Sequence, residues 1–160
     1  MNKLEEIYQF NKRLLEQLNI DYQEWQHEPI LDFETDERIA KELGWSGTHS
    51  KSLFLKLKGA GYALLLTDKD SRLDSKGVKA RTGKRPSIVS NEEMTEKIGC
   101  VPGAVCPFGL PTEIDIIIDT QLYQHSEILY TPGKPDVTFA IPAAQLPAVL
   151  NQLDNQVLEM

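Results

Sequence analysis

The sequence predicts an α+β fold, with a mixed or largely antiparallel sheet and helices around it. Helical periodicity occurs near both ends of the chain, while the middle contains apolar runs bounded by glycine, as in β-hairpins. This order lacks the regular alternation of strands and helices that builds a doubly wound sheet. The chain has 160 residues, of which 41% are apolar, and shows no repeat or break in composition. We therefore expect a single compact domain over residues 1–160.

The first elements are a helix and a short extended segment. Residues 3–18 place leucine and isoleucine at helical spacing, with Asn2 and Glu5 as a capping pair and Asn19 as a stop. The segment 22–27 has no helical pattern and is expected to be extended.

A second helix and a hairpin follow. The helix is expected over residues 34–43, with Thr35 as its cap and Gly44 at its end. The apolar runs 51–58 and 62–67 flank Gly-Ala-Gly, which favours a β-hairpin with leucines on one face.

The rest of the chain alternates short strands and helices, with turn-rich connections between them. Strands are expected at residues 86–89, 113–119, 127–130 and 136–141. Helices are expected at 71–80, at 91–98 between Ser90 and Gly99, and from Pro142 onward.

Composition and charge exclude several classes of protein. No apolar run approaches the roughly 20 residues that span a bilayer, and the N-terminus lacks a secretory signal pattern, so we expect a cytoplasmic protein without a membrane partner. A net charge of −7 argues against a general DNA-coating protein, and no basic recognition helix predicts sequence-specific DNA binding. One short segment, however, is basic throughout and is either a solvated loop or a site for a nucleic-acid backbone. This basic segment contains Lys76, Lys79, Arg81, Lys84 and Arg85.

Both cysteines lie in one short stretch, GCVPGAVCPFGL at residues 99–110. Cys100 and Cys106 have a spacing unlike structural zinc sites, and the scattered histidines do not complete a ligand set, so no metal or other cofactor is expected. Cys106 precedes a proline in a glycine-rich loop, where it is either an exposed nucleophile or a loop filler, and Cys100 is expected to be a buried apolar residue. The remaining interpretation is a stiff backbone that uses glycine to approach a ligand closely.

The same stretch resembles the G-x-x-P-G-x-V-x-P-F-G-L signature of the YbaK-type freestanding aminoacyl-tRNA deacylases, which are related to the editing domain of bacterial prolyl-tRNA synthetase. The segment HSKSLFL at 49–55 is similar to the H-T-K-N-L-F-L of that family, HEPI at 27–30 to its H-x-P-[VI], and PDVT at 135–138 to its N-[TD]-A-T. The resemblance implies a strongly curved mixed sheet. It also implies hydrolysis of the ester that joins a wrong amino acid to tRNA, with alanine or cysteine on proline tRNA as the first expectation and serine or threonine esters in other branches.

The resemblance also implies roles for residues. Lys51 becomes the central cation, which binds the terminal phosphate or stabilises negative charge on the ester carbonyl, while main-chain groups of Gly103 and Gly109 orient the ester and the attacking water. No general base is evident, and the family implies proton transfer assisted by the ribose 2′-hydroxyl. The expected substrate contacts are His27, His49, Ser52, Cys106, Pro107, Phe108 and Thr131.

One departure from the family concerns substrate choice. Alanine-specific relatives often have F-H-P where this chain has YTP, so Thr131 stands in the position of the histidine. Aminoacyl-tRNA is the expected partner, gripped by the basic segment and delivered by prolyl-tRNA synthetase. The alternative is a non-catalytic module of the same fold that binds tRNA or a small ligand.

Overall fold

The structure, a computed structural model, describes residues 2–160. The helices are α1 (Lys3–Gln17), α2 (Phe33–Leu43), α3 (Ser75–Thr82), α4 (Asn91–Ile98) and α5 (Leu146–Gln152), with 3₁₀ turns η1 (Thr120–Gln124) and η2 (Ala143–Gln145). The strands are β1 (Gln23–Gln26), β2 (Thr48–Leu57), β3 (Tyr62–Asp68), β4 (Pro86–Ile88), β5 (Asp115–Ile118), β6 (Glu127–Tyr130), β7 (Val137–Pro142) and β8 (Val157–Glu159).

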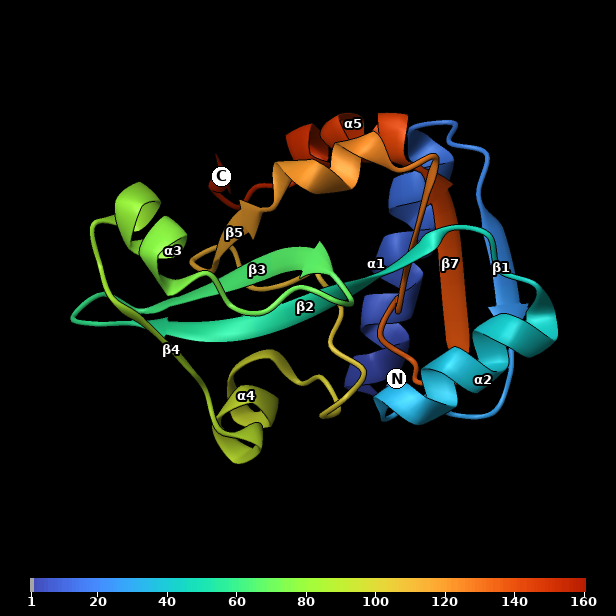
Figure 1. Cartoon of the computed structure of the whole chain (residues 1–160), viewed down its shortest axis with the longest axis horizontal. Coiled ribbons are helices and arrows are strands. Elements are labelled where there is room, and N and C mark those ends of the chain that lie inside the picture. Colours follow the sequence, from blue (N-terminus) through green and yellow to red (C-terminus); the bar gives the residue numbers. More distant parts are fainter. Residues whose placement is uncertain (1) are drawn as a thin grey trace.

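The strands form one mixed, strongly curved sheet in the order β1-β7-β6-β2-β3-β5-β8, with β4 also paired to β2. Strand β2 joins the two halves, because its first residues pair with β6 in parallel and the residues from Ser50 onward pair with β3 antiparallel. Figure 1 shows the consequence, since β2 and β3 run crosswise to β1 and β7. The predicted α+β class and curved mixed sheet are confirmed.

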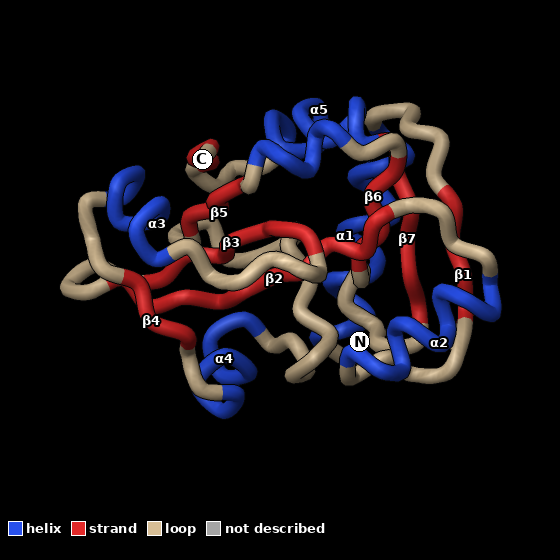
Figure 2. The backbone as a smooth tube through the Cα atoms, viewed as in Figure 1, coloured by secondary structure: helices blue, strands red, loops and turns tan. Residues whose placement is uncertain are grey.

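Helices surround the sheet (Figure 2). Apolar side chains fill the space between the helices and the sheet. The larger core contains Phe54 of β2 and Leu15 of α1, while the opposite face of the hairpin packs Leu55 against Val78 of α3. Leu53, Leu55 and Leu57 all lie on this second face, as their alternation predicts. Each fully buried leucine contributes about 1.5–3 kcal/mol.

Helix ends follow the capping rules, with one correction. Asn2 accepts a hydrogen bond from the Glu5 amide at 2.8 Å, and Gly44 adopts the left-handed conformation at the end of α2, both as predicted. Thr35, however, is not the cap of α2. The Asp32 carboxylate accepts the Thr35 amide at 2.8 Å, so the helix begins two residues before its expected cap.

Other boundaries differ because tertiary pairing overrides local pattern. Strand β2 begins at Thr48 since its first residues pair with β6, and α3 begins only at Ser75, after its cap Asp74. The sequence did not predict η1 or β8, and β8 is a strand only because it pairs with β5. The final helix begins at Leu146, since β7 continues to Pro142.

None of the helices in residues 2–160 has the length and apolar character that a bilayer crossing requires.

Candidate active site

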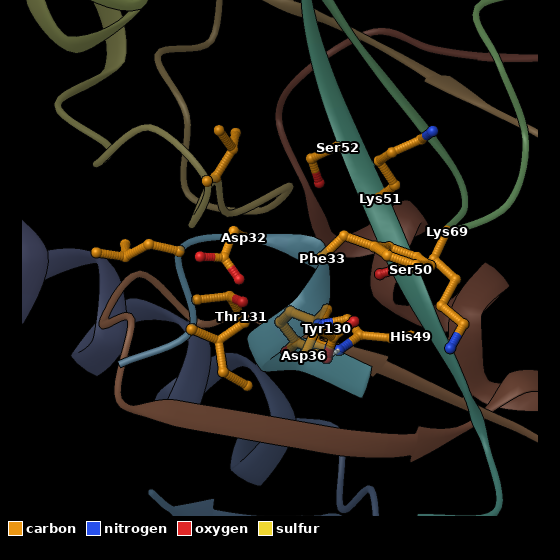
Figure 3. A pocket seen from close by; sticks show the side chains of 14 residues that line it. Asp32, Phe33, Asp36, His49, Ser50, Lys51, Ser52, Lys69, Tyr130 and Thr131 are labelled. Carbon is orange, nitrogen blue, oxygen red and sulfur yellow. Dashed lines mark hydrogen bonds and ion pairs between the residues drawn. The ribbon is translucent and has the colours of Figure 1, made fainter. Parts of the chain in front are cut away.

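A cavity of about 260 Å³ lies where β2 passes from one half of the sheet to the other. Its walls come from five segments that are distant in sequence: residues 30–36, residues 49–52, Lys69, residues 103–105 and residues 130–131. Figure 3 shows these side chains around β2 and the first turns of α2. The family-like segments around His27, His49, Gly103 and Thr131 therefore converge on one region, and each supplies at least one residue to the cavity lining, which for the HEPI segment is Ile30.

Successive residues of β2 face different parts of this cavity. The His49 ring lies against Asp36, whereas in Figure 3 the Lys51 side chain leaves the strand on the side opposite to Ser52. The Ser50 hydroxyl donates to the Leu129 carbonyl at 2.8 Å, which ties β2 to β6. Ser52 lines the cavity, as expected for a substrate contact.

Lys51 lines the cavity, but its ammonium group is turned away from the cavity centre. It donates a hydrogen bond to the Ser71 carbonyl, in the loop between β3 and α3. In Figure 3 the side chain extends away from Asp32 and Thr131. The ammonium group is therefore bound to the loop before α3 and not to the backbone of residues 103–105.

Gly103 has a structural reason to be glycine. Its φ is +86°, and a Cβ atom there would lie 2.2 Å from the Leu31 carbonyl oxygen. Both residues line the cavity, so this close contact holds two of its walls together.

Gly109 lies elsewhere. Its position is against the ring of Phe10 on α1, where a Cβ would be 2.9 Å from the ring, and it is not among the residues that line the cavity. Its glycine is thus explained by packing, and the expectation that its backbone orients the substrate is not met.

Cys106, Pro107 and Phe108 are buried in the core rather than exposed to a ligand. The Cys106 thiol is fully buried and contacts the Asn11 amide nitrogen at 3.3 Å, and burial raises its pKa. Of the two interpretations of Cys106, the exposed nucleophile is therefore wrong and the loop filler remains, because the loop turns the thiol towards α1; its expected contact with substrate is not met. Cys100 is buried, as predicted.

Asn11 explains how this loop is held. Its side-chain amide donates to the carbonyl oxygens of Phe108 at 3.0 Å and Ile7 at 2.9 Å, and it is completely buried. No group of three or more His, Cys, Asp or Glu side chains suited to a metal ion occurs among residues 2–160.

His27 also lies outside the cavity lining. Its Nδ1 lies 2.7 Å from the Glu28 carbonyl and must donate to it, so its Nε2 accepts from the Thr138 hydroxyl at 2.8 Å. With both ring nitrogens engaged, His27 fixes β1 to β7, and its expected contact with substrate is replaced by a structural one.

Thr131 does line the cavity, at the end of β6 next to Tyr130. Tyr130 is fully buried, and loss of solvent raises the pKa of its phenol well above the ordinary value, so it stays neutral. The wall formed by these two residues and Val105 is mostly apolar, with one hydroxyl at position 131.

The basic segment lies on α3 and the turn that follows it, and all five of its cations are exposed. Pro86 pairs with Leu57, six residues along β2 from Lys51, which places the Arg85 end of the segment about 20 Å from Lys51. In Figure 1, α3 and α2 accordingly lie at opposite ends of the molecule. None of the five cations is among the residues that line the cavity.

Several cavity residues were not predicted from the sequence. They are the exposed apolar Leu31 and Phe33, the acidic Asp32 and Asp36, and Lys69, whose ammonium lies 5.9 Å from the centre of the Phe33 ring. The only sequence signal is the pattern LDFETD, in which a helix cap follows an apolar residue. Nothing in the pattern indicates that this helix start faces β2.

With this geometry established, comparison with known proteins assigns the family. The model of the aminoacyl-tRNA editing domain matches residues 32–148, which is well over half of the chain. The chain belongs to this family. The matched range contains every residue of the cavity except Ile30 and Leu31.

Individual relatives agree with this assignment. The chain is 26% identical to the prolyl-tRNA editing protein ProX of Acetoanaerobium sticklandii, over 88% of each chain. It is 28% identical to the multifunctional Ser/Thr-tRNA deacylase ProXp-y of Escherichia coli strain K12, over 82% of this chain and 80% of the relative. The predicted family and the predicted aminoacyl-tRNA deacylase activity are thereby confirmed.

Solved structures show the same fold at low identity. A hypothetical protein superposes with a TM-score of 0.77 at 19% identity, over 92% of this chain and 96% of the other. A candidate trans-editing enzyme for prolyl-tRNA synthetase superposes with a TM-score of 0.72 at 22% identity, over 96% and 95% of the two chains.

Proposed function

We propose that this editing domain removes a small amino acid from the 3′ end of a mischarged tRNA, and that the cavity beside β2 holds the aminoacyl group. The convergence of the HSKS segment, Gly103 and Thr131 on this cavity is the observation that supports the proposal most. Its volume of about 260 Å³ is below the roughly 300–1,000 Å³ of sites for drug-sized ligands, which favours a small side chain.

Alanine or cysteine on proline tRNA is the first candidate substrate, supported by the relative that is named a prolyl-tRNA editing protein. Serine and threonine esters are the second, because Ser52 and Thr131 bring hydroxyl groups to the cavity and another relative is named a Ser/Thr-tRNA deacylase. A difference of one methylene in size changes the free energy of transition-state binding by only about 1–3 kcal/mol. A hydroxyl group in the cavity wall therefore matters for the choice between these amino acids. Prolyl-tRNA synthetase is the proposed source of the substrate.

The approach to the cavity has the properties of a nucleic-acid surface. Phe33 is 50% exposed at the rim, and Lys69 lies above its ring. An exposed aromatic face beside a cation is suited to stacking with the terminal base and to contact with a phosphate. The basic segment, whose Arg85 end is about 20 Å from Lys51, would contact the acceptor stem of the same tRNA.

Lys51 takes part by exchanging partners. Its ammonium group donates to the Ser71 carbonyl. A phosphate or a developing oxyanion is a stronger partner for an ammonium than a neutral carbonyl, and the flexible side chain allows the exchange.

Release of amino acid from a panel of mischarged tRNAs tests the proposal. The panel contains alanyl-, cysteinyl-, seryl- and threonyl-tRNA, and we expect hydrolysis of at least one ester, with a loss of 100-fold or more in kcat/KM for Lys51→Ala. Lys56→Ala is the matched control, because Lys56 lies on the same strand with an exposed side chain outside the cavity.

Two results contradict the proposal. Equal activity of Lys51→Ala and Lys56→Ala would show that Lys51 does not contribute to hydrolysis. Tight binding of tRNA by the wild-type protein without hydrolysis of any ester identifies it instead as a binding module.

A further inference from the structure

His49 and Asp36 form a nearly buried pair inside the cavity. The His49 Nδ1 lies 2.6 Å from the Asp36 Oδ1, and each side chain is only 11% exposed. His49 comes from β2 and Asp36 from the first turn of α2, and both line the cavity. Figure 3 shows the two side chains against each other, below β2.

The hydrogen bond fixes which ring nitrogen is free. A carboxylate only accepts, so Nδ1 carries the proton and donates it to Asp36, and a neutral His49 keeps its lone pair on Nε2. Within residues 2–160, Nε2 of His49 has no hydrogen-bond partner. It is also not a buried atom, because the buried side-chain atoms without a partner are Asn11 Oδ1, Trp45 Nε1 and the Tyr130 hydroxyl. Solvent or a ligand in the cavity therefore reaches it.

The imidazole is held in place on a second side. Trp45 follows α2 directly, and its ring meets the His49 ring edge-on with centroids 5.9 Å apart. Trp45 is itself packed against Trp25 at 5.4 Å and His27 at 5.8 Å. The ring of His49 is thus clamped between a carboxylate and an indole, which is the arrangement that preserves orientation during proton transfer.

We propose that His49 is the general base of this site and that Asp36 is its positioning residue. This inference rests on the proposed deacylase function. A water molecule attacks the ester carbonyl carbon and gives its proton to Nε2 of His49, and Asp36 stabilises the imidazolium that forms. The bond from the carbonyl carbon to the ribose 3′-oxygen then breaks. That oxygen takes the proton back from the imidazolium, directly or through the vicinal 2′-hydroxyl, which leaves a free amino acid and an intact tRNA end.

Charged groups of both signs line the cavity around the pair. Asp36 and Asp32 of α2 favour the protonated ring, while Lys51 of β2 and Lys69 after β3 oppose it. Tyr130 of β6 is neutral, and His27, which follows β1, packs against the Trp45 ring.

The test compares pH profiles of kcat and KM between pH 5 and 7.5, after subtraction of the uncatalysed hydrolysis, with the mischarged tRNA that the wild-type protein cleaves best. For His49→Gln we expect a fall in kcat of about 100-fold to 1,000-fold, little change in KM, and loss of the acidic limb of the profile. For Asp36→Asn we expect a smaller fall in kcat and an acidic limb displaced to lower pH, since the imidazolium loses its counter-charge. His125→Gln is the matched control, because His125 is exposed and outside the cavity.

Partial restoration of His49→Ala by added imidazole supports the base, because a merely structural histidine is not replaced by a free one. Two results overturn the inference while leaving the deacylase function intact: a wild-type pH profile in His49→Gln, or a loss of activity that appears only as a raised KM together with a lowered melting temperature. If the wild-type protein cleaves no ester at all, the proposed function fails first and this inference fails with it.

Discussion

Replacement of Gly103 by alanine tests whether the close contact between two walls of the cavity maintains the site. A Cβ at this position would lie 2.2 Å from the Leu31 carbonyl oxygen, 2.9 Å from its carbonyl carbon and 3.1 Å from its Cα. These are backbone atoms, so no side-chain rotation relieves the collision. The φ of +86° adds about 1–2 kcal/mol of strain for any residue with a Cβ, and forced overpacking adds about 1–3 kcal/mol.

Gly59→Ala is the matched control for this experiment. Gly59 lies in the β2–β3 turn with a similar φ of +79°, but a Cβ there meets nothing within 4 Å. We expect Gly59→Ala to lower the free energy of unfolding by the strain alone and to leave deacylation unchanged. Gly103→Ala is expected to cost about 1–3 kcal/mol more and to reduce kcat/KM, because residues 31 and 103 are forced apart.

Urea unfolding at constant m-value measures the first effect, and release of amino acid from mischarged tRNA measures the second. Equal destabilisation by the two substitutions would refute the steric argument. Full activity of a destabilised Gly103→Ala variant would show that the contact with Leu31 stabilises the fold without shaping the site.

Four further outcomes follow from particular interactions. Cys106 should react with a thiol reagent at least about 1,000-fold more slowly in the native protein than in urea, since burial both shields it and raises its pKa; rapid native labelling would contradict its placement. Phe33→Ala should raise KM for mischarged tRNA, whereas Leu43→Ala, which removes a similarly exposed side chain from the far end of α2, should not. Replacing the cations of the basic segment by neutral residues should reduce the slope of log affinity for tRNA against log salt concentration by about 0.7–0.9 for each phosphate contact that is lost. An unchanged slope would show that the segment does not bind tRNA. The hydrogen bond from the Thr35 amide lowers the pKa of Asp32 in the folded protein. The Asp32 carboxylate therefore stabilises the fold fully above about pH 4, and this stabilisation is lost as the pH falls through the pKa of the folded state. Asp32→Asn keeps the cap but does not titrate, so urea unfolding should show a smaller loss of stability on acidification for this variant.

Local patterns predicted those parts of the fold that depend on neighbouring residues. The Asn2 cap, the left-handed Gly44 and Gly99, and the shared face of the β2 leucines all follow from interactions within a few positions of the chain. Strand β8 and the early start of β2 were missed because each depends on a partner strand far away in sequence.

The candidate site divides in the same way. Motif resemblance identified His49, Lys51, Ser52, Gly103 and Thr131, which all line the cavity. The same resemblance also selected His27, Cys106 and Gly109, which the fold uses for packing and hydrogen bonding instead. A motif records which residues occur together but not which way each of them faces.

The sequence by itself determined the family, the α+β class and part of the site, namely His49, Lys51, Ser52, Gly103 and Thr131, because periodicity, caps and motifs are properties of neighbouring positions. Only the tertiary structure decided that Asp36 of α2 lies 2.6 Å from His49 of β2, and that the Lys51 ammonium rests on the Ser71 carbonyl. These interactions join elements whose relative placement is set by burial over the whole core, and no local pattern contains that information.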